Sequence, residues 1–242
     1  MAVVRPNDAW KTKVQRGIMK YAGFRTGTRW RQPEALCGRE KGSRVGIEAE
    51  QEDSTALIRL RLGVTGHRVL AAREKIAAGV DLVLDRCQDR VPGGRLLLLS
   101  PLAEGGDRIV AERVLARPGC ALHATLPLRL EECLQDFLTE SSKEEFRTLL
   151  SRAERIIELP AAASRPAAYA AAGRYILEHI DALIAIWDGR DAQGPSGTAE
   201  IVRLARSRGL PLAWVRAGNR RPDTGEATTL GADQGTAVFE RW

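Results

Sequence analysis

Residues 182–209 read ALIAIWDGRDAQGPSGTAEIVRLARSRG, and the fold of the chain can be predicted outward from this stretch. Its first part, Ala182–Trp187, is a short apolar run typical of a strand that is covered on both faces. An acidic residue and a glycine end this run. The last part predicts an amphipathic helix, because it places Ile201, Val202 and Ala205 on one face. The stretch therefore predicts a buried strand, a loop and a helix.

The loop of this unit, residues 194–198, combines two glycines with two hydroxyl residues directly before the helix. Such a loop offers backbone N–H groups, hydroxyl donors and the positive end of a helix dipole in one place, which suits a phosphate. The same residue types are also common as ordinary N-caps. The loop alone therefore leaves a nucleotide-like anion and plain capping as equal alternatives.

The rest of the chain alternates between short apolar runs and amphipathic segments. Strands are expected at 57–64, 95–100, 121–126, 155–159 and 210–215, with 155–159 at an edge and 210–215 as the last strand. Helices are expected at 69–87, from the glycine pair near 105 through 115, and at 130–138, 143–153 and 166–180. The connections are too long for hairpins and favour parallel pairing. We predict an α/β fold, a Rossmann-like three-layer sandwich with a mainly parallel sheet and helices on both faces.

One folded domain is expected within the 242 residues, of which 44% are hydrophobic. We predict a basic, mostly irregular leader at 1–55, the organised domain at 56–216, and a polar tail at 217–242 that adds little to the core. Much of the excess positive charge behind the net charge of +6 lies in the leader. The leader also holds scattered aromatic residues that could stack on nucleic acid, but an unpacked tail or an over-long translation start is the favoured interpretation.

Four cysteines are widely spaced, with no CxxC pair and no histidine at metal-ligand spacing. Neither a disulfide framework nor a zinc site is predicted from them. No apolar run is long enough to cross a bilayer, and the N-terminus lacks the compact apolar segment of a secretory signal. We therefore expect a cytoplasmic protein that does not bind a membrane, a metal or a cofactor.

Three glycine-bearing loops, Gly63–Arg68, Ser100–Arg108 and Asp188–Thr198, follow predicted strands. Ligands of parallel sheets bind at the carboxyl ends of strands, where these loops would meet. They supply hydrogen-bond donors, a charge pair at a helix start and a carboxylate for ribose hydroxyls, which suits a phosphorylated ribose better than a metal or a lipid. The candidate ligand-binding residues are Thr65, Gly66, His67, Arg68, Ser100, Gly105, Gly106, Asp107, Arg108, Asp188, Gly194, Ser196, Gly197 and Thr198.

Each of these side chains also has a purely structural interpretation. His67 could cap its own helix or satisfy a carbonyl group. Arg108 could pair with Asp107 or Glu112 at the surface, where an ion pair adds little stability. Asp188 could simply close a turn. The dinucleotide pattern GxGxxG, the elbow GxSxG and the Walker pattern GxxxxGK[ST] do not occur, so hydride transfer, nucleophilic catalysis and ATP hydrolysis have no direct support.

The three loops read GVTGHR at 63–68, SPLAEGGDR at 100–108 and GPSGTAE at 194–200. In this order they resemble the SLOG superfamily, a Rossmann-like group. It includes the LOG cytokinin-activating phosphoribohydrolases, the DNA-processing protein DprA and ligand-sensing domains of bacterial defence systems. The resemblance covers about 57–215 and implies binding of a nucleotide or nucleotide-derived signal at the loop cluster. The LOG branch cleaves the N-glycosidic bond of nucleoside monophosphates.

The chain departs from the LOG pattern PGGxGTxxE at both catalytic positions. The glutamate three residues after the threonine is replaced by Ile201, and Glu200 lies one residue too early. The LOG arginine nine residues before the aspartate that opens the strand, here Asp181, is replaced by Ala172. Arg174 lies two residues further on. Glycosidic cleavage needs a carboxylate and a cation or acid at the reacting bond, so these departures favour binding over turnover.

The first functional prediction is therefore a binding module for a nucleotide or a nucleotide-derived signal. The alternative is a LOG-like phosphoribohydrolase in which Glu200 and Arg174 act as the catalytic residues from their shifted positions. A weaker hypothesis makes the leader a nucleic-acid arm and the core a scaffold, although nucleic acid is not an expected partner. The alanine-rich helix and the resemblance to dimeric relatives also predict a homodimer.

Overall fold

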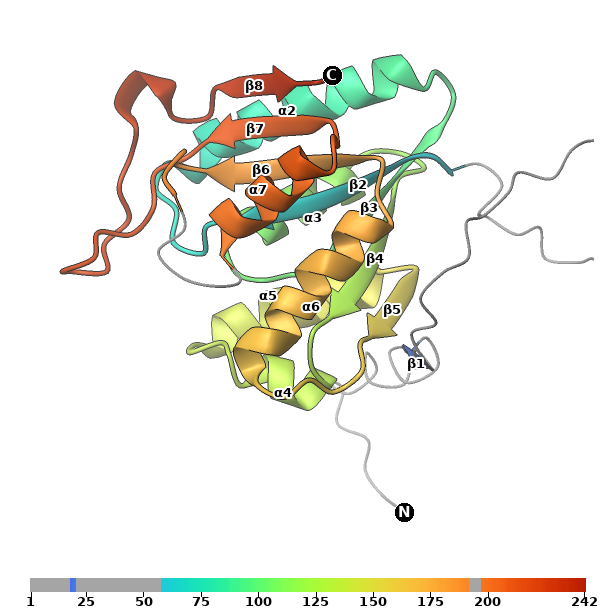
Figure 1. Ribbon diagram of the computed structural model, residues 1–242, viewed down its shortest axis with the longest axis vertical. Coiled ribbons are helices and arrows are strands. Elements are labelled where there is room, and N and C mark those ends of the chain that lie inside the picture. The colour runs from blue at the N-terminus through green and yellow to red at the C-terminus, as the bar shows by residue number, and fades with distance from the viewer. Residues whose placement is uncertain (1–17, 21–57, 192–196) are drawn as a thin grey trace, which may run out of the picture.

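The described part of the chain is built around one eight-stranded sheet (Figure 1). The computed structural model describes residues 18–20, 58–191 and 197–242. The strand order is β1-β5-β4-β3-β2-β6-β7-β8, and every neighbouring pair is parallel except β7 with β8. The strands are β1 (Ile18–Lys20), β2 (Ile58–Gly66), β3 (Arg95–Ser100), β4 (Ala121–Leu126), β5 (Arg155–Glu158), β6 (Ala182–Trp187), β7 (Leu212–Arg216) and β8 (Ala237–Glu240).

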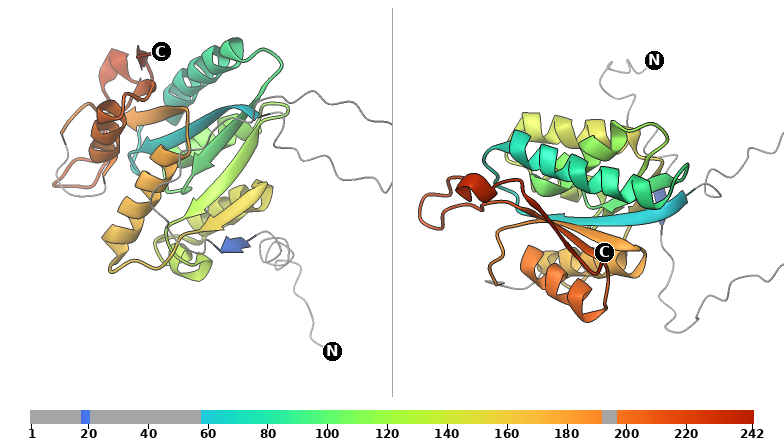
Figure 2. Two further views of the ribbon diagram at one scale, coloured as in Figure 1. Left: turned by 45° about the vertical axis from the view of Figure 1, so that its right-hand side comes forward. Right: turned by 90° about the horizontal axis from the view of Figure 1, so that it is seen from above.

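Helices cover both faces of this sheet, so the predicted α/β sandwich is confirmed (Figure 2). One layer contains α2, α3 and α5, and the other contains α6 and α7. The helices are α2 (Arg73–Arg90), α3 (Gly106–Leu115), α4 (Leu130–Leu134), α5 (Glu140–Arg152), α6 (Arg165–Glu178) and α7 (Thr198–Ser207). In the described part of the chain, none of them is long and apolar enough to cross a membrane.

The uninterrupted apolar run of β3 follows from these two layers. Successive residues of a strand point to opposite faces of the sheet. Leu96 and Leu98 pack in the core beneath α2, α3 and α5, whereas Leu97 and Leu99 pack in the core beneath α6. Because both faces are covered, no position of the strand interior suits a polar residue.

The order in which the chain adds strands to the sheet reverses at β2. The chain passes from β2 through α2 to β3 on one side, and from β6 through α7 to β7 on the other side, with the two helices on opposite faces. The loops that leave β2 and β6 therefore separate at the carboxyl ends of these neighbouring strands. In open α/β sheets this switch point is where a ligand crevice forms.

Two glycines allow the loops after β2 and β3 to touch. A Cβ atom on Gly66 would lie 2.9 Å from the Cα of Gly106, closer than a real side chain comes. The N–H of Gly106 donates to the carbonyl of His67 at 3.0 Å. These glycines therefore join the start of α3 to the end of β2, next to the switch point.

The prediction that residues 217–242 form a tail of little weight in the core was wrong, as was the prediction that 210–215 is the last strand. The segment supplies β8, which pairs with β7 in antiparallel fashion. It also holds Gln234, which is 4% exposed. The Gln234 amide accepts from the N–H groups of Gly218 and Leu230, and donates to the carbonyl of Ala71 at 2.8 Å. Most residues between Arg220 and Asp233 are exposed, which explains the polar composition of the segment, whereas the buried Gln234 satisfies backbone groups.

Two further predictions need correction. The strand at 155–159 is not an edge, because β1 pairs with its outer side, and the leader therefore contains a short strand. The helix expected at 69–87 begins only at Arg73, because Ala72 adopts a left-handed conformation with φ of 50° and ends the preceding loop. The rest of the 1–55 prediction lies outside the described residues.

Candidate functional site

A cavity of about 670 Å³ opens at the carboxyl edge of the sheet, above the switch point. The end of β2 lines it with Thr65, the loop after β2 with Arg68, and the loop after β3 with Glu104. The first turn of α7 adds Gly197 and Thr198. Segments from all three predicted loops therefore meet at one place, as the topology requires.

The structure divides the sequence-predicted residues into three groups. The cavity lining contains Thr65, Gly66, His67, Arg68, Asp107, Gly197 and Thr198. The residues that do not line it are Ser100, Gly105, Gly106, Arg108 and Asp188. Gly194 and Ser196 lie outside the described residues. Half of the predicted set therefore faces the cavity.

His67 connects the ends of three strands. Its N–H donates to the carbonyl of Ile186 in β6 at 3.0 Å, and its carbonyl accepts from Gly106 at the start of α3. Its Nε2 lies 3.1 Å from both the backbone nitrogen and Oδ1 of Asp188. A neutral Nε2 accepts from the N–H, whereas only a protonated ring donates to the carboxylate. Burial lowers the pKa of His67 more than the Asp188 charge raises it, which favours the neutral ring as acceptor.

Asp188, expected to accept from a ribose, is instead committed to protein contacts. Its Oδ1 accepts from the N–H of Arg190 at 3.1 Å and lies beside His67. It lines a neighbouring hollow of about 540 Å³ that shares Thr198 and Arg220 with the main cavity. The interpretation of Asp188 as a residue that closes a turn fits these contacts better.

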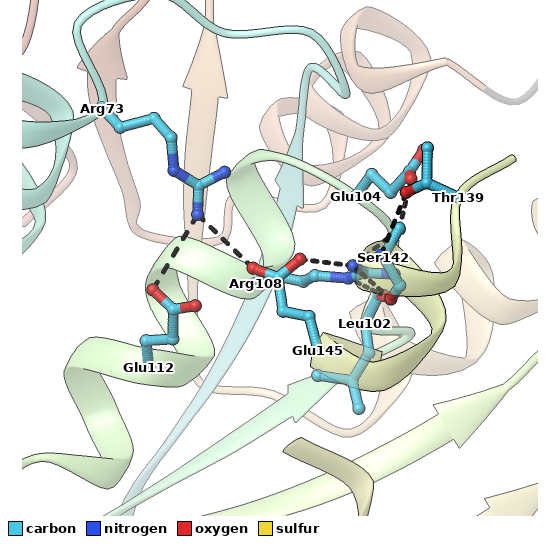
Figure 3. Close-up of polar contacts among 8 residues, drawn as sticks. All are labelled: Arg73, Leu102, Glu104, Arg108, Glu112, Thr139, Ser142 and Glu145. Atoms are coloured by element: carbon cyan, nitrogen blue, oxygen red, sulfur yellow. Dashed lines mark hydrogen bonds and ion pairs between the residues drawn. The ribbon is translucent and has the colours of Figure 1, made fainter. Parts of the chain in front are cut away.

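Arg108 is fully buried and does not line the cavity, and its polar contacts are drawn in Figure 3. Its guanidinium donates to the carbonyl of Leu102 at 3.2 Å and to Glu145 at 2.5 Å. It also donates to the carbonyl and hydroxyl oxygens of Ser142, and stacks 4.4 Å from the Phe137 ring centroid. The prediction that Arg108 contacts a ligand was therefore wrong, and so was the alternative that it pairs with Asp107 or Glu112 at the surface. The residue instead connects α3 to α5.

Ser100 and Gly105 likewise support the loop after β3. The Ser100 hydroxyl is buried and accepts from the N–H of Leu102 at 3.0 Å. Gly105 has a φ of 80°, and a Cβ atom there would lie 2.3 Å from the His67 carbonyl oxygen. Only glycine fits this position, so the backbone geometry alone accounts for a glycine here and no ligand contact is needed to explain it.

Asp107 is the most deeply buried carboxyl group of the cavity, at 3% exposure. Burial raises its pKa to about 7, against the hydrogen bond from the Ala103 N–H and the charges of Arg68 and Arg108, which lower it. The group is therefore partly protonated near neutral pH. It can both donate to and accept from a ligand.

The sequence did not single out several groups that line the cavity. Tyr169 of α6 donates its hydroxyl to Asp136, and the Arg68 guanidinium lies 5.3 Å from the Tyr169 ring centroid. Burial, followed by the contact with Asp136, raises the pKa of Tyr169, so the phenol stays protonated. Asn219 and Arg220 enter from the segment after β7. No local pattern marks these residues, because only the tertiary fold brings them to the switch point.

The two residues proposed for catalysis lie away from the cavity lining. Arg174 is exposed on α6, and Glu200 is half-buried in the first turn of α7. The positions where the LOG pattern has its arginine and glutamate do line the cavity, but Ala172 and Ile201 occupy them. The sequence indicated that Glu200 and Arg174 are shifted from the LOG catalytic positions, and the structure places neither residue in the cavity lining.

No protein-family model matches the chain, and no curated protein matches it in sequence. The likeness to the SLOG superfamily therefore rests on the three loops and on their order along the chain. The cavity combines a helix N-terminus, exposed arginines, carboxylates and an apolar wall. Such a surface can hold an anionic group at one place and a planar, donor-bearing group at another.

Proposed function

We propose that this protein binds a nucleotide or a nucleotide-derived signal, as a SLOG-like domain, in the cavity above β2 and β6. The supporting observation is the convergence of the loops after β2 and β3 with the start of α7 around one hollow of about 670 Å³. This volume lies in the range of small-ligand sites. The position at the switch point is the usual one for a ligand in an open α/β sheet.

The anionic part of the ligand belongs at the start of α7 in this proposal. Gly197 is the N-cap and offers no side chain to occupy the first-turn N–H groups. Thr198 adds a hydroxyl, and the exposed Arg68 and Arg220 add positive charge around the same cavity. Helix N–H groups together with arginines favour a phosphate.

The planar base belongs on the wall formed by α6 and α7. This wall carries Ala172, Ile176 and Ile201, together with the ring of Tyr169. Apolar and aromatic side chains provide the surface on which a base packs, and the polar edge of the cavity remains for the sugar phosphate.

The phosphoribohydrolase alternative is the weaker proposal. It needs a carboxylate and a cation at the glycosidic bond, but Ala172 and Ile201 occupy the corresponding cavity positions. Incubation with AMP, CMP, GMP and UMP, followed by analysis for free base and ribose 5-phosphate, decides between the two. Release of base that Glu200→Gln abolishes would establish the enzyme and overturn the binding-only proposal.

The test of binding is a thermal-shift panel on the full chain with mononucleotides, cyclic nucleotides and ADP-ribose. A ligand at 100 times its Kd adds about 2.7 kcal/mol, which raises the Tm by roughly 5–10 °C for a chain of this size. We expect Arg220→Ala to weaken binding about 10- to 100-fold, because it removes a charge-assisted contact.

The matched control for this variant is Arg203→Ala. It removes an exposed arginine of α7 that does not line the cavity. Its affinity should equal that of the wild type. If no phosphorylated ligand shifts the Tm of the folded protein, the proposed function is wrong.

Two broader expectations stay predictions. We propose a homodimer on the basis of the alanine-rich α6 and the SLOG resemblance, and a cytoplasmic location on the basis of the sequence features given above. Light scattering of the full chain measures the oligomeric state directly.

A further inference from the structure

Glu104 is a cavity-lining carboxylate whose orientation is fixed from behind. It lies in the loop after β3, half-buried, and its Oε1 accepts from the hydroxyl of Ser142 in the first turn of α5 (Figure 3). Ser142 is not a cavity-lining residue. Glu104 therefore reaches the cavity while one of its oxygens is held by the helix behind it.

The direction of this hydrogen bond follows from the buried guanidinium of Arg108. Arg108 Nη1 donates to the Ser142 hydroxyl oxygen at 3.0 Å, and a guanidinium has no acceptor. The single hydroxyl proton of Ser142 must therefore point elsewhere, and Glu104 is the acceptor that it meets. Arg108 and Ser142 act as positioning residues for an acceptor-only carboxylate.

Arg108 is itself held rigidly enough to serve this purpose. It is 0% exposed and contacts Leu102 and Glu145 as well as Ser142. Arg73 at the start of α2 pairs with the same Glu145 at 3.6 Å (Figure 3). The chain of contacts therefore links α2, α3 and α5 behind one cavity residue.

The position of Glu104 fits the sugar of a bound nucleotide. Glu104 follows β3 and the phosphate-binding start of α7 follows β6, with β2 between them. Two strand spacings separate these loops by about 10 Å. The base is assigned to the apolar wall on α6 and α7 and the phosphate to the start of α7. The ribose lies between them, and its hydroxyls are donors that every ribonucleotide offers to a carboxylate at this position. Asp188, the other expected acceptor, does not line this cavity, and its Oδ1 already accepts from the N–H of Arg190.

We propose that Glu104, oriented by Ser142 and Arg108, accepts hydrogen bonds from the ribose hydroxyls and makes the site select ribonucleotides over deoxyribonucleotides. This inference rests on the proposed function, since it assigns the sugar subsite of the same cavity. A carboxylate aimed at a hydroxyl is left without its partner when the hydroxyl is absent. Deoxy analogues are then rejected by the loss of a charge-assisted hydrogen bond.

The experiment measures Kd by calorimetry for AMP, CMP, GMP and UMP and for their 2′-deoxy and 3′-deoxy counterparts, with the full chain. We expect the wild type to prefer a ribonucleotide over at least one deoxy form by about 10- to 100-fold. In Glu104→Gln and Ser142→Ala this ratio should fall toward one, mainly through weaker ribonucleotide binding. Ser142→Thr, which keeps the hydroxyl, should restore most of the ratio.

The ratio separates positioning from general damage, because a merely unstable site weakens the binding of both sugars equally. Glu144→Gln is the matched control: it neutralises an exposed carboxylate of α5 that pairs with Arg147 and lies outside the cavity lining. It should leave the ratio unchanged. Binding without sugar preference in the wild type, or a preference that survives in Glu104→Gln, would overturn this inference while leaving the nucleotide site intact. Absence of binding by these nucleotides, by the cyclic nucleotides and by ADP-ribose would instead overturn the proposed function, whereas binding of ADP-ribose or a cyclic nucleotide alone would overturn only the sugar assignment made with mononucleotides.

Discussion

His67 carries the polar contact between the loops after β2 and β6, and this contact depends on its protonation state. Burial lowers the pKa of His67 below that of a free histidine, which is about 6.5. Below that pH the unfolded chain binds the proton more readily than the folded protein. The stability contributed by a neutral His67 is therefore complete above about pH 6.5 and is lost as the pH falls further.

We expect His67→Leu to be less stable than the wild type by about 1–2 kcal/mol at pH 7.5, because the N–H of Asp188 loses its acceptor. At pH 5 the difference should shrink, since only the wild type loses stability through His67. Asp107, whose pKa of about 7 is raised by burial, gives a pH dependence of opposite sign. Asp107 is present in both proteins, so its contribution cancels in the stability difference between the wild type and His67→Leu. Urea unfolding at several pH values measures the difference in unfolding free energy between the two proteins. A difference that does not change with pH would contradict the prediction.

The candidate residues illustrate what a sequence can predict about a single side chain. The glycine and hydroxyl pattern correctly indicated which loops meet, so Thr65 and Thr198 were found. It did not indicate which way a side chain points. Arg108 and Asp188 lie in the expected loops but contact protein groups, because their orientation depends on α5 and on His67.

At the scale of elements, the packing of α2 against the segment before β8 depends on a close backbone approach. A Cβ atom on Gly79 would lie 2.0 Å from the carbonyl oxygen of Gly235 and 2.9 Å from Val215. Gly235 has a φ of 88° and approaches the Lys75 carbonyl equally closely. The absence of side chains at these two positions lets the segment lie flat on the helix.

Gly79→Ala tests this approach, because helix propensity and packing predict opposite signs. Propensity alone favours alanine by about 1 kcal/mol. The backbone oxygen cannot yield easily, so we expect a net loss of about 1–3 kcal/mol in unfolding free energy. Ala78→Gly, at an exposed neighbouring position of α2, calibrates the propensity term in the same urea titration. A Gly79→Ala protein as stable as the wild type would contradict the packing described above.

The buried central strands were easier to predict than the start of α2 and the edge strand β8. Ala121–Leu126 and Ala182–Trp187 have the predicted bounds because both faces of each strand are covered, which demands an unbroken apolar run. The start of α2 was missed because the left-handed Ala72 leaves no local signal. β8 was missed because its edge position tolerates the polar residues around it.

At the scale of the whole molecule, the segment 217–242 completes both the sheet and the cavity. It pairs with β7, buries Gln234 against the loop after β2, and brings Arg220 to the cavity. Composition alone suggested a polar tail that adds little to the core. The long-range pairing that makes it structural is visible only when the sheet order is known.

We expect a chain shortened after Arg216 to lose its cooperative thermal transition or to melt more than 10 °C below the full chain. Truncation leaves the edge of β7 without its partner and the carbonyl of Ala71 without its donor. Circular dichroism melting provides the measurement. The melting temperature of Gln234→Ala, which removes only the buried amide, should lie between those of the full chain and the shortened chain. A truncated chain that melts with the full one would contradict this role.

The placement of Arg220 has a consequence for protein synthesis. The ribosome makes residues 217–242 after every other part of the described fold, and a domain generally folds as a unit. A nascent chain that has released only the strands through β7 still lacks two residues of the cavity lining, Asn219 and the cationic Arg220. Under the proposed function, the site for the ligand is therefore complete only after translation has passed this segment, and a polypeptide stalled before it would not bind the nucleotide.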